Sequence, residues 1–222
     1  MKTYLINNNS KKLILFFNGW SMDENHLLRL KSSDYDILVC SNYLDLLPLC
    51  NDELRNYNNI TVIAWSMGVF AASKLRKYLN NVSLSIAING TLKPIDDKYG
   101  IPQAIFEATL NNFSAETREK FYKRMFKNSE DFEKFLINQP KRNAEDQKRE
   151  LITLQKYIIN KNDSQNCFNR VIIGKYDKII SAKNQINSWN EKEKLNPLII
   201  EEGHYPFFRW QSFEEIIYST QV

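Results

Sequence analysis

The chain has few of the residues that mark several large protein classes. Its 222 residues include only 3 Cys, 6 Gly, 6 Pro and 2 His. An odd, small number of cysteines, behind an N-terminus without a signal-peptide apolar region, predicts reduced thiols in a cytoplasmic protein rather than a disulfide framework. The low Gly and Pro counts exclude collagen-like and proline-rich regions. No apolar run approaches the ~18 residues that a membrane span needs, so we expect no membrane association.

Neither sign of charge dominates the sequence. Lys and Arg number 30 and Asp and Glu 26, and the net charge of +4 is too small to predict nucleic-acid binding by itself. The 43% hydrophobic and 25% charged residues are typical of a globular protein, and the length fits one domain spanning 1–222, which we expect to be a monomer. The sequence has no His pair, no C-x-x-C spacing and no carboxylates clustered near a His, so neither metal nor cofactor is expected.

Short apolar runs alternate with segments of helical spacing along most of the chain. This alternation predicts an α/β fold with a mostly parallel central sheet. The first two runs flank the turn-forming residues 7–10 and predict a hairpin. The expected strands are residues 3–6, 12–17, 35–40, 60–64, 84–88, 170–173 and 198–200, and the expected helices are 23–31, 67–79 and 210–218.

Residues 101–166 interrupt this alternation. The segment has helical periodicity, mixed charges and no convincing strand. Ligands of α/β sheets bind at the carboxyl ends of the strands. Helices inserted between two strands most simply cover that edge, so residues 101–166 are expected to form a helical lid.

The strongest local signal lies at residues 60–70, where a β-branched strand ends, a serine follows and a helix begins. This order is that of a nucleophile elbow, which places a serine above the edge of a sheet. The tight turn needs small residues two positions before and after Ser66, and these are Ala64 and Gly68. Glycine is the more common residue at the first position. Ser66 could instead only cap the helix that begins at Met67.

A second candidate element, Asn18-Gly19-Trp20, directly follows the strand at 12–17. In serine hydrolases of this fold, a backbone N–H of this loop and the N–H of the residue after the nucleophile together bind the oxyanion. Trp20 and Met67 are therefore the expected donors. The alternative is a glycine-assisted loop in which Trp20 only packs.

The sequence offers one well-placed base and one well-placed acid. His204 follows the last apolar strand and precedes the last helix, where this fold carries its catalytic His, whereas His26 lies in a predicted helix among leucines. Asp177 lies three residues past Gly174 at the end of the preceding strand, where it can bind the His Nδ1–H, although it could also be a surface-turn residue. The order Ser66, Asp177, His204 is that of hydrolases with this fold. Together these signals predict an active serine hydrolase.

Four segments of the chain resemble the BioG family, small α/β hydrolases that act as pimeloyl-acyl-carrier-protein methyl ester esterases in biotin synthesis. They are Phe-Phe-Asn-Gly-Trp-Ser-Met-Asp at 16–23, Ala-Trp-Ser-Met-Gly at 64–68, Ile-Asn-Gly-Thr at 88–91 and Gly-His-Tyr-Pro-Phe at 203–207. The similarity covers most of the chain and is least specific in the lid. The resemblance implies an α/β-hydrolase fold and a catalytic Ser66, Asp177 and His204. It also implies a pimeloyl chain on acyl carrier protein, whose distal methyl ester is cut while the thioester is spared.

Several lid residues are candidates for contact with the substrate or its carrier. Phe121, Met125 and Phe126 could line the acyl channel, or each could belong to the core of the lid. Since the carrier protein is acidic in this family's pathway, basic lid residues could steer it, or else form an ordinary solvated face. These basic candidates are Lys123, Arg124, Lys127, Lys141 and Arg142.

Two other functions remain open on the sequence alone. The same triad would serve another serine hydrolase for small esters or thioesters, because the lid sequence does not exclude one. A hydrolase-fold binding protein without turnover is the second, although the intact triad argues against it.

Overall fold

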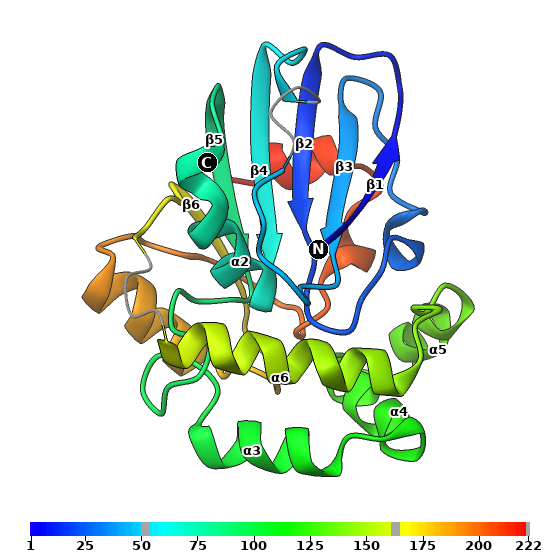
Figure 1. Ribbon diagram of the computed structural model, residues 1–222, viewed down its shortest axis with the longest axis vertical. Helices are drawn as coiled ribbons and strands as arrows, with labels where there is room; N and C mark the ends of the chain where they lie inside the picture. The colour runs from blue at the N-terminus through cyan, green and yellow to red at the C-terminus, as the bar shows by residue number, and fades with distance from the viewer. Residues whose placement is uncertain (50–53, 161–164, 221–222) are drawn as a thin grey trace.

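The computed structural model describes residues 1–49, 54–160 and 165–220, and Cys50 lies outside this range. The described residues contain a 7-stranded sheet in the order β1-β3-β2-β4-β5-β6-β7 (Figure 1), in which only β1 runs antiparallel to its neighbour. The strands are β1 (Lys2–Ile6), β2 (Lys12–Phe17), β3 (Asp36–Ser41), β4 (Asn59–Trp65), β5 (Val82–Ile88), β6 (Arg170–Gly174) and β7 (Leu198–Ile200). The predicted α/β fold with a mostly parallel sheet is confirmed.

The central strands are apolar on both sides because helices cover both faces of the sheet. In β2, the Phe16 ring lies 6.0 Å from the Phe213 ring of α8, whereas Leu15 and Phe17 belong to the core on the α2 side. The helices of the described residues are η1 (Asn25–Leu27), α2 (Met67–Leu75), η2 (Arg76–Tyr78), α3 (Gln103–Asn112), α4 (Ala115–Arg124), α5 (Ser129–Ile137), α6 (Ala144–Asn160), α7 (Ala182–Ile186), η3 (Asn187–Lys192), η4 (Phe207–Arg209) and α8 (Phe213–Tyr218).

The predicted hairpin between the first two strands is wrong. β1 pairs with β3, and β2 lies on the far side of β3. Asp36, at the start of β3, holds the connecting loop, because its Oδ1 accepts the N–H groups of Asn8 and Ser10 at 2.8 and 3.0 Å. These contacts carry the chain across β3, so β1 becomes an edge of the sheet.

The helix predicted at 23–31 is also wrong in extent, since only the 3₁₀ turn η1 forms there. Lys31 instead pairs with the C-terminal segment: its N–H donates to the Gln211 carbonyl at 3.1 Å, and its carbonyl accepts the Phe213 N–H at 3.0 Å. That pairing pulls the end of the segment into an extended form. The helices predicted at 67–79 and 210–218 are present, the first ending as η2 and the second beginning after its cap, Ser212.

Four helices, α3, α4, α5 and α6, lie between β5 and β6 in the chain, where the sequence predicts an insertion. In Figure 1 they lie across the lower end of the sheet, at the carboxyl ends of the parallel strands. Side chains of Ser114 and Asn128 cap α4 and α5, which fixes where these helices begin. No helix in the described part of the chain is both long and apolar enough to cross a membrane.

Asp36→Asn should destabilise the protein at neutral pH and have less effect in acid. Burial alone would raise the pKa of Asp36, but hydrogen bonds from the Ser10 N–H, the Tyr57 hydroxyl and the Asn8 N–H outweigh it and hold the pKa below its ordinary 3.8. A folded-state pKa below the unfolded value gives a stabilisation that is present above about pH 4 and is lost as the pH falls through the folded-state value. We expect a loss of ~1–2 kcal/mol in the free energy of unfolding at pH 7, measured by urea denaturation.

The matched control is Asp34→Asn, which changes an exposed carboxylate two positions away. It should leave the free energy of unfolding within ~0.5 kcal/mol of the wild type. If the free energies of unfolding of wild type and Asp36→Asn differed by the same amount at neutral pH and at about pH 3, the stabilising role given to the charged Asp36 would be contradicted.

Candidate active site

Ser66 joins β4 to α2 in a backbone conformation that residues with side chains rarely adopt. Its φ of 57° and ψ of −125° turn the chain sharply from strand to helix. The turn brings α2 against the loop after β2, where a Cβ on Gly68 would lie 2.2 Å from the Phe17 carbonyl oxygen and 2.4 Å from that of Asn18. Only glycine fits there, whereas the buried methyl group of Ala64 is accommodated on the strand side.

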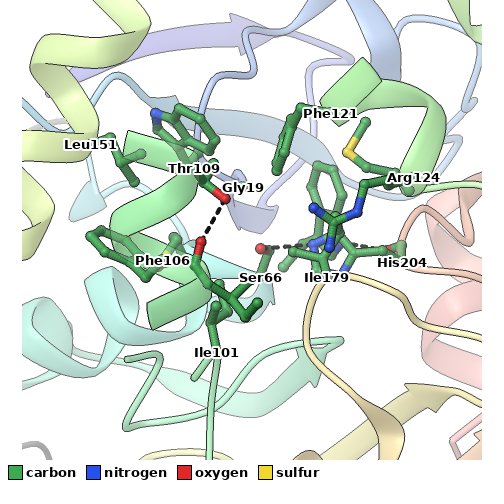
Figure 2. A pocket seen from close by; sticks show the side chains of 15 residues that line it. Gly19, Ser66, Ile101, Phe106, Thr109, Phe121, Arg124, Leu151, Ile179 and His204 are labelled. Carbon is green, nitrogen blue, oxygen red and sulfur yellow. Dashed lines mark hydrogen bonds between the residues drawn. The ribbon is translucent and has the colours of Figure 1, made fainter. Parts of the chain in front are cut away.

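Ser66, His204 and Asp177 are linked by a continuous chain of hydrogen bonds. Ser66 Oγ lies 2.9 Å from His204 Nε2, and His204 Nδ1 lies 2.7 Å from Asp177 Oδ2. Figure 2 shows the first of these bonds at the edge of a pocket. A carboxylate only accepts, so Nδ1 carries the imidazole hydrogen and Nε2 accepts the Ser66 hydroxyl. The structure thus brings together the three residues that the sequence predicts as a triad, all of them buried.

Asp177 is held by more than His204. Its Oδ1 accepts the backbone N–H groups of Ile179 and Ile180 at 2.8 and 2.9 Å, and its Oδ2 accepts Gln185 Nε2 from α7 at 2.8 Å. Four donors around one carboxylate fix its orientation. Gln185 carries no signal in the sequence, because nothing there places α7 beside Asp177. Within the described residues, no group of three or more His, Cys, Asp and Glu is placed to hold a metal ion.

Asn89, at the end of β5, orders the loop that carries His204. Its Nδ2 donates to the carbonyls of Gly203 and His204, each at 2.9 Å, and its Oδ1 accepts the Gly174 N–H at 2.6 Å. Trp65 Nε1 also donates to the His204 carbonyl at 2.8 Å. The backbone of His204 is therefore fixed from β4 and β5 at once. A polar residue directly after a buried strand is the sequence signal that could have found Asn89.

The N–H groups of Trp20 and Met67 have no acceptor among the described residues, which leaves both able to bind an oxyanion. The loop that carries Trp20 is ordered by Asn18, whose Oδ1 accepts His26 Nε2–H at 2.8 Å and the Gly19 N–H at 3.1 Å. Burial lowers the pKa of His26 to about 3, so this imidazole is neutral near pH 7. His26 is thus a buried loop support, and it lies in the 3₁₀ turn η1 rather than in the longer helix that the sequence predicts at 23–31.

An apolar cavity opens onto Ser66 and His204 (Figure 2). Its walls come from the loop after β2, the elbow, and helices α3, α4 and α6, and outside the serine and histidine their polar side chains are Thr109 and Arg124. Two of the residues predicted to contact an acyl chain, Phe121 and Met125, line this cavity. The prediction for Phe126 is wrong: its ring packs 5.1 Å from that of Tyr205, in the core behind the cavity wall.

The predicted carrier-binding residues differ in their environments. Lys123 and Lys141 are exposed. Arg124 lines the cavity and donates to the Lys178 carbonyl at 3.0 Å. Lys127 is 34% exposed and pairs with Glu202 at 3.0 Å.

Arg142 does not share this exposure. Its side chain is 9% exposed and pairs with Asp146 at 2.8 Å and with the fully buried Glu150 at 2.6 Å. This burial is inconsistent with a carrier contact.

Comparisons with known proteins identify the family and the fold of the chain. The family model described as pimeloyl-ACP methyl esterase BioG matches residues 1–216. The chain belongs to the BioG family. A crystal structure of BioG from Haemophilus influenzae has a TM-score of 0.87 and 31% identity, and the match covers 97% of this chain and 99% of that one. An uncharacterized protein of Haemophilus influenzae is 33% identical over 95% of this chain and 96% of its own.

A further relative is longer than this BioG-family chain. A malonyl-[acyl-carrier protein] O-methyltransferase of Bacteroides fragilis is 41% identical over 182 residues, which are 82% of this chain and 37% of that protein. This chain therefore spans little more than a third of that relative. An esterase from Exiguobacterium antarcticum, with 15% identity and a TM-score of 0.70 over 99% of this chain and 95% of its own, shares the fold. Family and fold together support an esterase role for the chain.

Asn89→Ala should be strongly destabilising. The substitution leaves the Gly203 and His204 carbonyls without the donor Asn89 Nδ2, and the Gly174 N–H without the acceptor Asn89 Oδ1. It also leaves an alanine, without these side-chain bonds, in a backbone conformation with φ of 45°. We expect the free energy of unfolding to fall by ~2–4 kcal/mol in chemical denaturation. Asn111→Ala, on the exposed side of α3, is the control and should change it by less than ~0.5 kcal/mol. Equal effects of the two substitutions would refute the role given to Asn89.

Proposed function

We propose that the chain is a carboxylesterase that hydrolyses the methyl ester of pimeloyl-acyl-carrier protein to pimeloyl-acyl-carrier protein and methanol, in the synthesis of the biotin precursor. Its place of action would be the cytoplasm. The proposal is carried by the hydrogen-bonded Ser66, His204 and Asp177 beside an apolar cavity in a member of the BioG family. An apolar cavity suits the methylene chain of such a substrate.

In the proposed acylation step, Ser66 Oγ attacks the ester carbonyl carbon while its proton passes to His204 Nε2. The carbonyl oxygen becomes an oxyanion bound by the N–H groups of Trp20 and Met67. Loss of one such donor typically costs ~3–4 kcal/mol in the barrier. Asp177 holds the imidazole in place and stabilises its positive charge. The C–O bond to the methoxy group then breaks, and His204 returns the proton to give methanol.

In the proposed deacylation step, a water molecule takes the position that methanol has left. His204 accepts a proton from this water as its oxygen attacks the acyl-serine carbonyl. The second tetrahedral intermediate collapses with release of Ser66, which recovers its proton from His204. The products are the free carboxylate of the pimeloyl chain and the enzyme in its starting state, and this chemistry uses only groups of the chain and water.

We propose that the thioester is spared because the carrier protein keeps it too far from Ser66 to react. The distal ester must lie at Ser66 while the carrier protein remains outside the helices α3, α4, α5 and α6, which we propose act as a lid. The thioester then lies toward the mouth of the cavity, away from the nucleophile. Phe121 and Met125 are proposed to contact the methylene chain, since both line the cavity.

The Bacteroides fragilis relative supports a methyl ester on a carrier protein. Its name describes methylation of malonyl-acyl-carrier protein, and a segment similar to this chain makes up 37% of its length. We infer that this relative joins the formation of a carrier-bound methyl ester to its later removal. The remaining part of that protein would then supply the substrate class that the present chain consumes.

The decisive test compares the wild type with Ser66→Ala on pimeloyl-acyl-carrier-protein methyl ester. We expect wild type to release methanol and leave the thioester intact, and Ser66→Ala to lose at least ~10³-fold in kcat. Mass spectrometry of the carrier protein measures both bonds. A fluorophosphonate probe should label wild type at Ser66 and leave Ser66→Ala unlabelled. The control Ser83→Ala changes an exposed serine on β5 and should be fully active.

Other outcomes would favour the rival functions. Turnover of short p-nitrophenyl esters or of acyl thioesters without turnover of the carrier-linked methyl ester would favour another serine hydrolase. The absence of both turnover and labelling would favour a binding protein.

We further propose that Lys123, Arg124, Lys127 and Lys141 steer the acidic carrier protein. All four lie on or near the helices around the cavity, and Arg124 lines the cavity itself. Their positive charges would raise the rate of encounter and fix the orientation of the carrier protein at the cavity mouth. Arg142 is left out of this surface because its charge is paired inside the molecule.

Lys123→Glu should raise KM for the carrier-linked ester on the order of 3–10-fold without changing kcat, because it acts on encounter rather than on chemistry. The effect should shrink as salt is added. Steady-state kinetics with the carrier-linked ester and with dimethyl pimelate separate an effect on carrier encounter from an effect on chemistry. The KM for the small ester should change neither with the substitution nor with added salt. Lys11→Glu, an exposed lysine just before β2 at the other end of the sheet, is the control. Equal KM changes for both esters would argue against a carrier surface.

A further inference from the structure

The loop between β2 and η1 makes a turn that its own residues hold only in part, through the Asn18 Nδ2 bond to the Asp23 carbonyl at 2.9 Å and the Met22 N–H bond to the Gly19 carbonyl at 3.4 Å. Ser21 has a φ of 73°, in the left-handed region. Further hydrogen bonds to this turn come from α6. Trp20 Nε1 donates to the Gln147 carbonyl at 2.7 Å, and Gln147 Nε2 donates to the Ser21 carbonyl at 2.9 Å. The Ser21 N–H donates to Glu150 Oε2 at 3.2 Å.

Glu150 is the central member of this contact. Its side chain has no exposed surface, and besides the Ser21 N–H it accepts the Tyr43 N–H at 2.9 Å and Arg142 Nη1 at 2.6 Å. Arg142 Nη1 also donates to the Met22 carbonyl at 3.1 Å. The Tyr43 hydroxyl in turn donates to the Asn18 carbonyl at 2.8 Å. The buried Glu150 carboxylate therefore connects α6 directly to Ser21 in the loop that carries Trp20. It also connects α6 to Asn18 through Tyr43 and to Met22 through Arg142.

We propose that Glu150 and Gln147 are positioning residues for the oxyanion hole. The inference rests on the proposed function, in which the Trp20 and Met67 N–H groups bind the oxyanion. Met67 is fixed by the elbow and by the start of α2. Trp20 lies instead in a loop whose own hydrogen bonds are joined by those from α6 to the Trp20 indole and to Ser21, so α6 helps to set the distance between the two donors. Oxyanion donors act only within a narrow range of distances, and a displacement of about 1 Å is costly.

This assignment divides the helices of the insertion by role. α6 belongs to the frame of the active site, since it holds the loop of Trp20 and also lines the cavity through Leu151. α3 and α4 supply the outer walls of the cavity through Phe106 and Phe121.

The test measures Glu150→Gln with dimethyl pimelate and with a trifluoromethyl ketone analogue of methyl pimelate. The ketone forms an oxyanion on adding to Ser66, so its affinity reports on the hole itself. We expect kcat to fall at least ~10-fold, KM to stay within ~2-fold, and the inhibition constant of the ketone to rise by the same factor as kcat falls. Glu145→Gln, at the exposed start of α6, is the matched control and should match wild type in all three.

Gln147→Met provides a second variant if Glu150→Gln does not fold. It removes the bond to the Ser21 carbonyl, keeps the backbone acceptor of Trp20, and should show a smaller loss with the same pattern. Unchanged kcat in a folded Glu150→Gln, or a fall in kcat without weaker ketone binding, would overturn the inference. If Ser66→Ala is as active as wild type, the proposed function fails and the inference falls with it.

Discussion

The left-handed backbone at Ser66 is the constraint on which the rest of the site depends. Such a conformation costs about 1–3 kcal/mol, which the surrounding structure must offset. The Ser66 N–H donates to the Ile88 carbonyl at 2.9 Å, and the Ser66 carbonyl accepts the Val69 N–H at 3.1 Å. A Cβ on Gly90 would lie 2.4 Å from the Ser66 carbonyl oxygen. The elbow therefore needs β4, β5, α2 and the loop after β2 in contact at once, and it brings them to one edge of the sheet.

The triad could be predicted because each of its members follows a strand that is recognisable from its own residues. Parallel strands bring their carboxyl ends to one edge, so a serine, an acid and a histidine at three such ends must come close together. Chain order then supplied the roles proposed for Ser66, Asp177 and His204. The mostly parallel sheet followed from the same short apolar runs. None of these steps required knowledge of a contact between distant segments.

The remaining parts of the site could not be predicted because they depend on such contacts. Gln185 reaches Asp177, and Glu150 reaches Ser21, across chain separations that no periodicity encodes. The hairpin prediction failed for the same reason, since Asp36 redirects a loop whose own residues favour a tight turn. Arg142 appeared to be one charge of a solvated face until its partners were known. Local sequence therefore located the three hydrogen-bonded residues of the candidate site, whereas long-range polar contacts determine how they are held.

The ion pair of Arg142 and Glu150 has a consequence for how the family can vary. Removal of one partner from a buried pair leaves an uncompensated charge and typically costs ~3–5 kcal/mol, whereas replacement of both by apolar side chains of similar volume can be nearly neutral. Here, however, an apolar replacement of Glu150 would also leave the Ser21 and Tyr43 N–H groups unpaired. The two positions are thus expected to change together or not at all. In an alignment of the family, positions 142 and 150 would therefore covary. Their covariation would reflect a contact between the first half of α6 and a loop more than a hundred residues earlier in the chain.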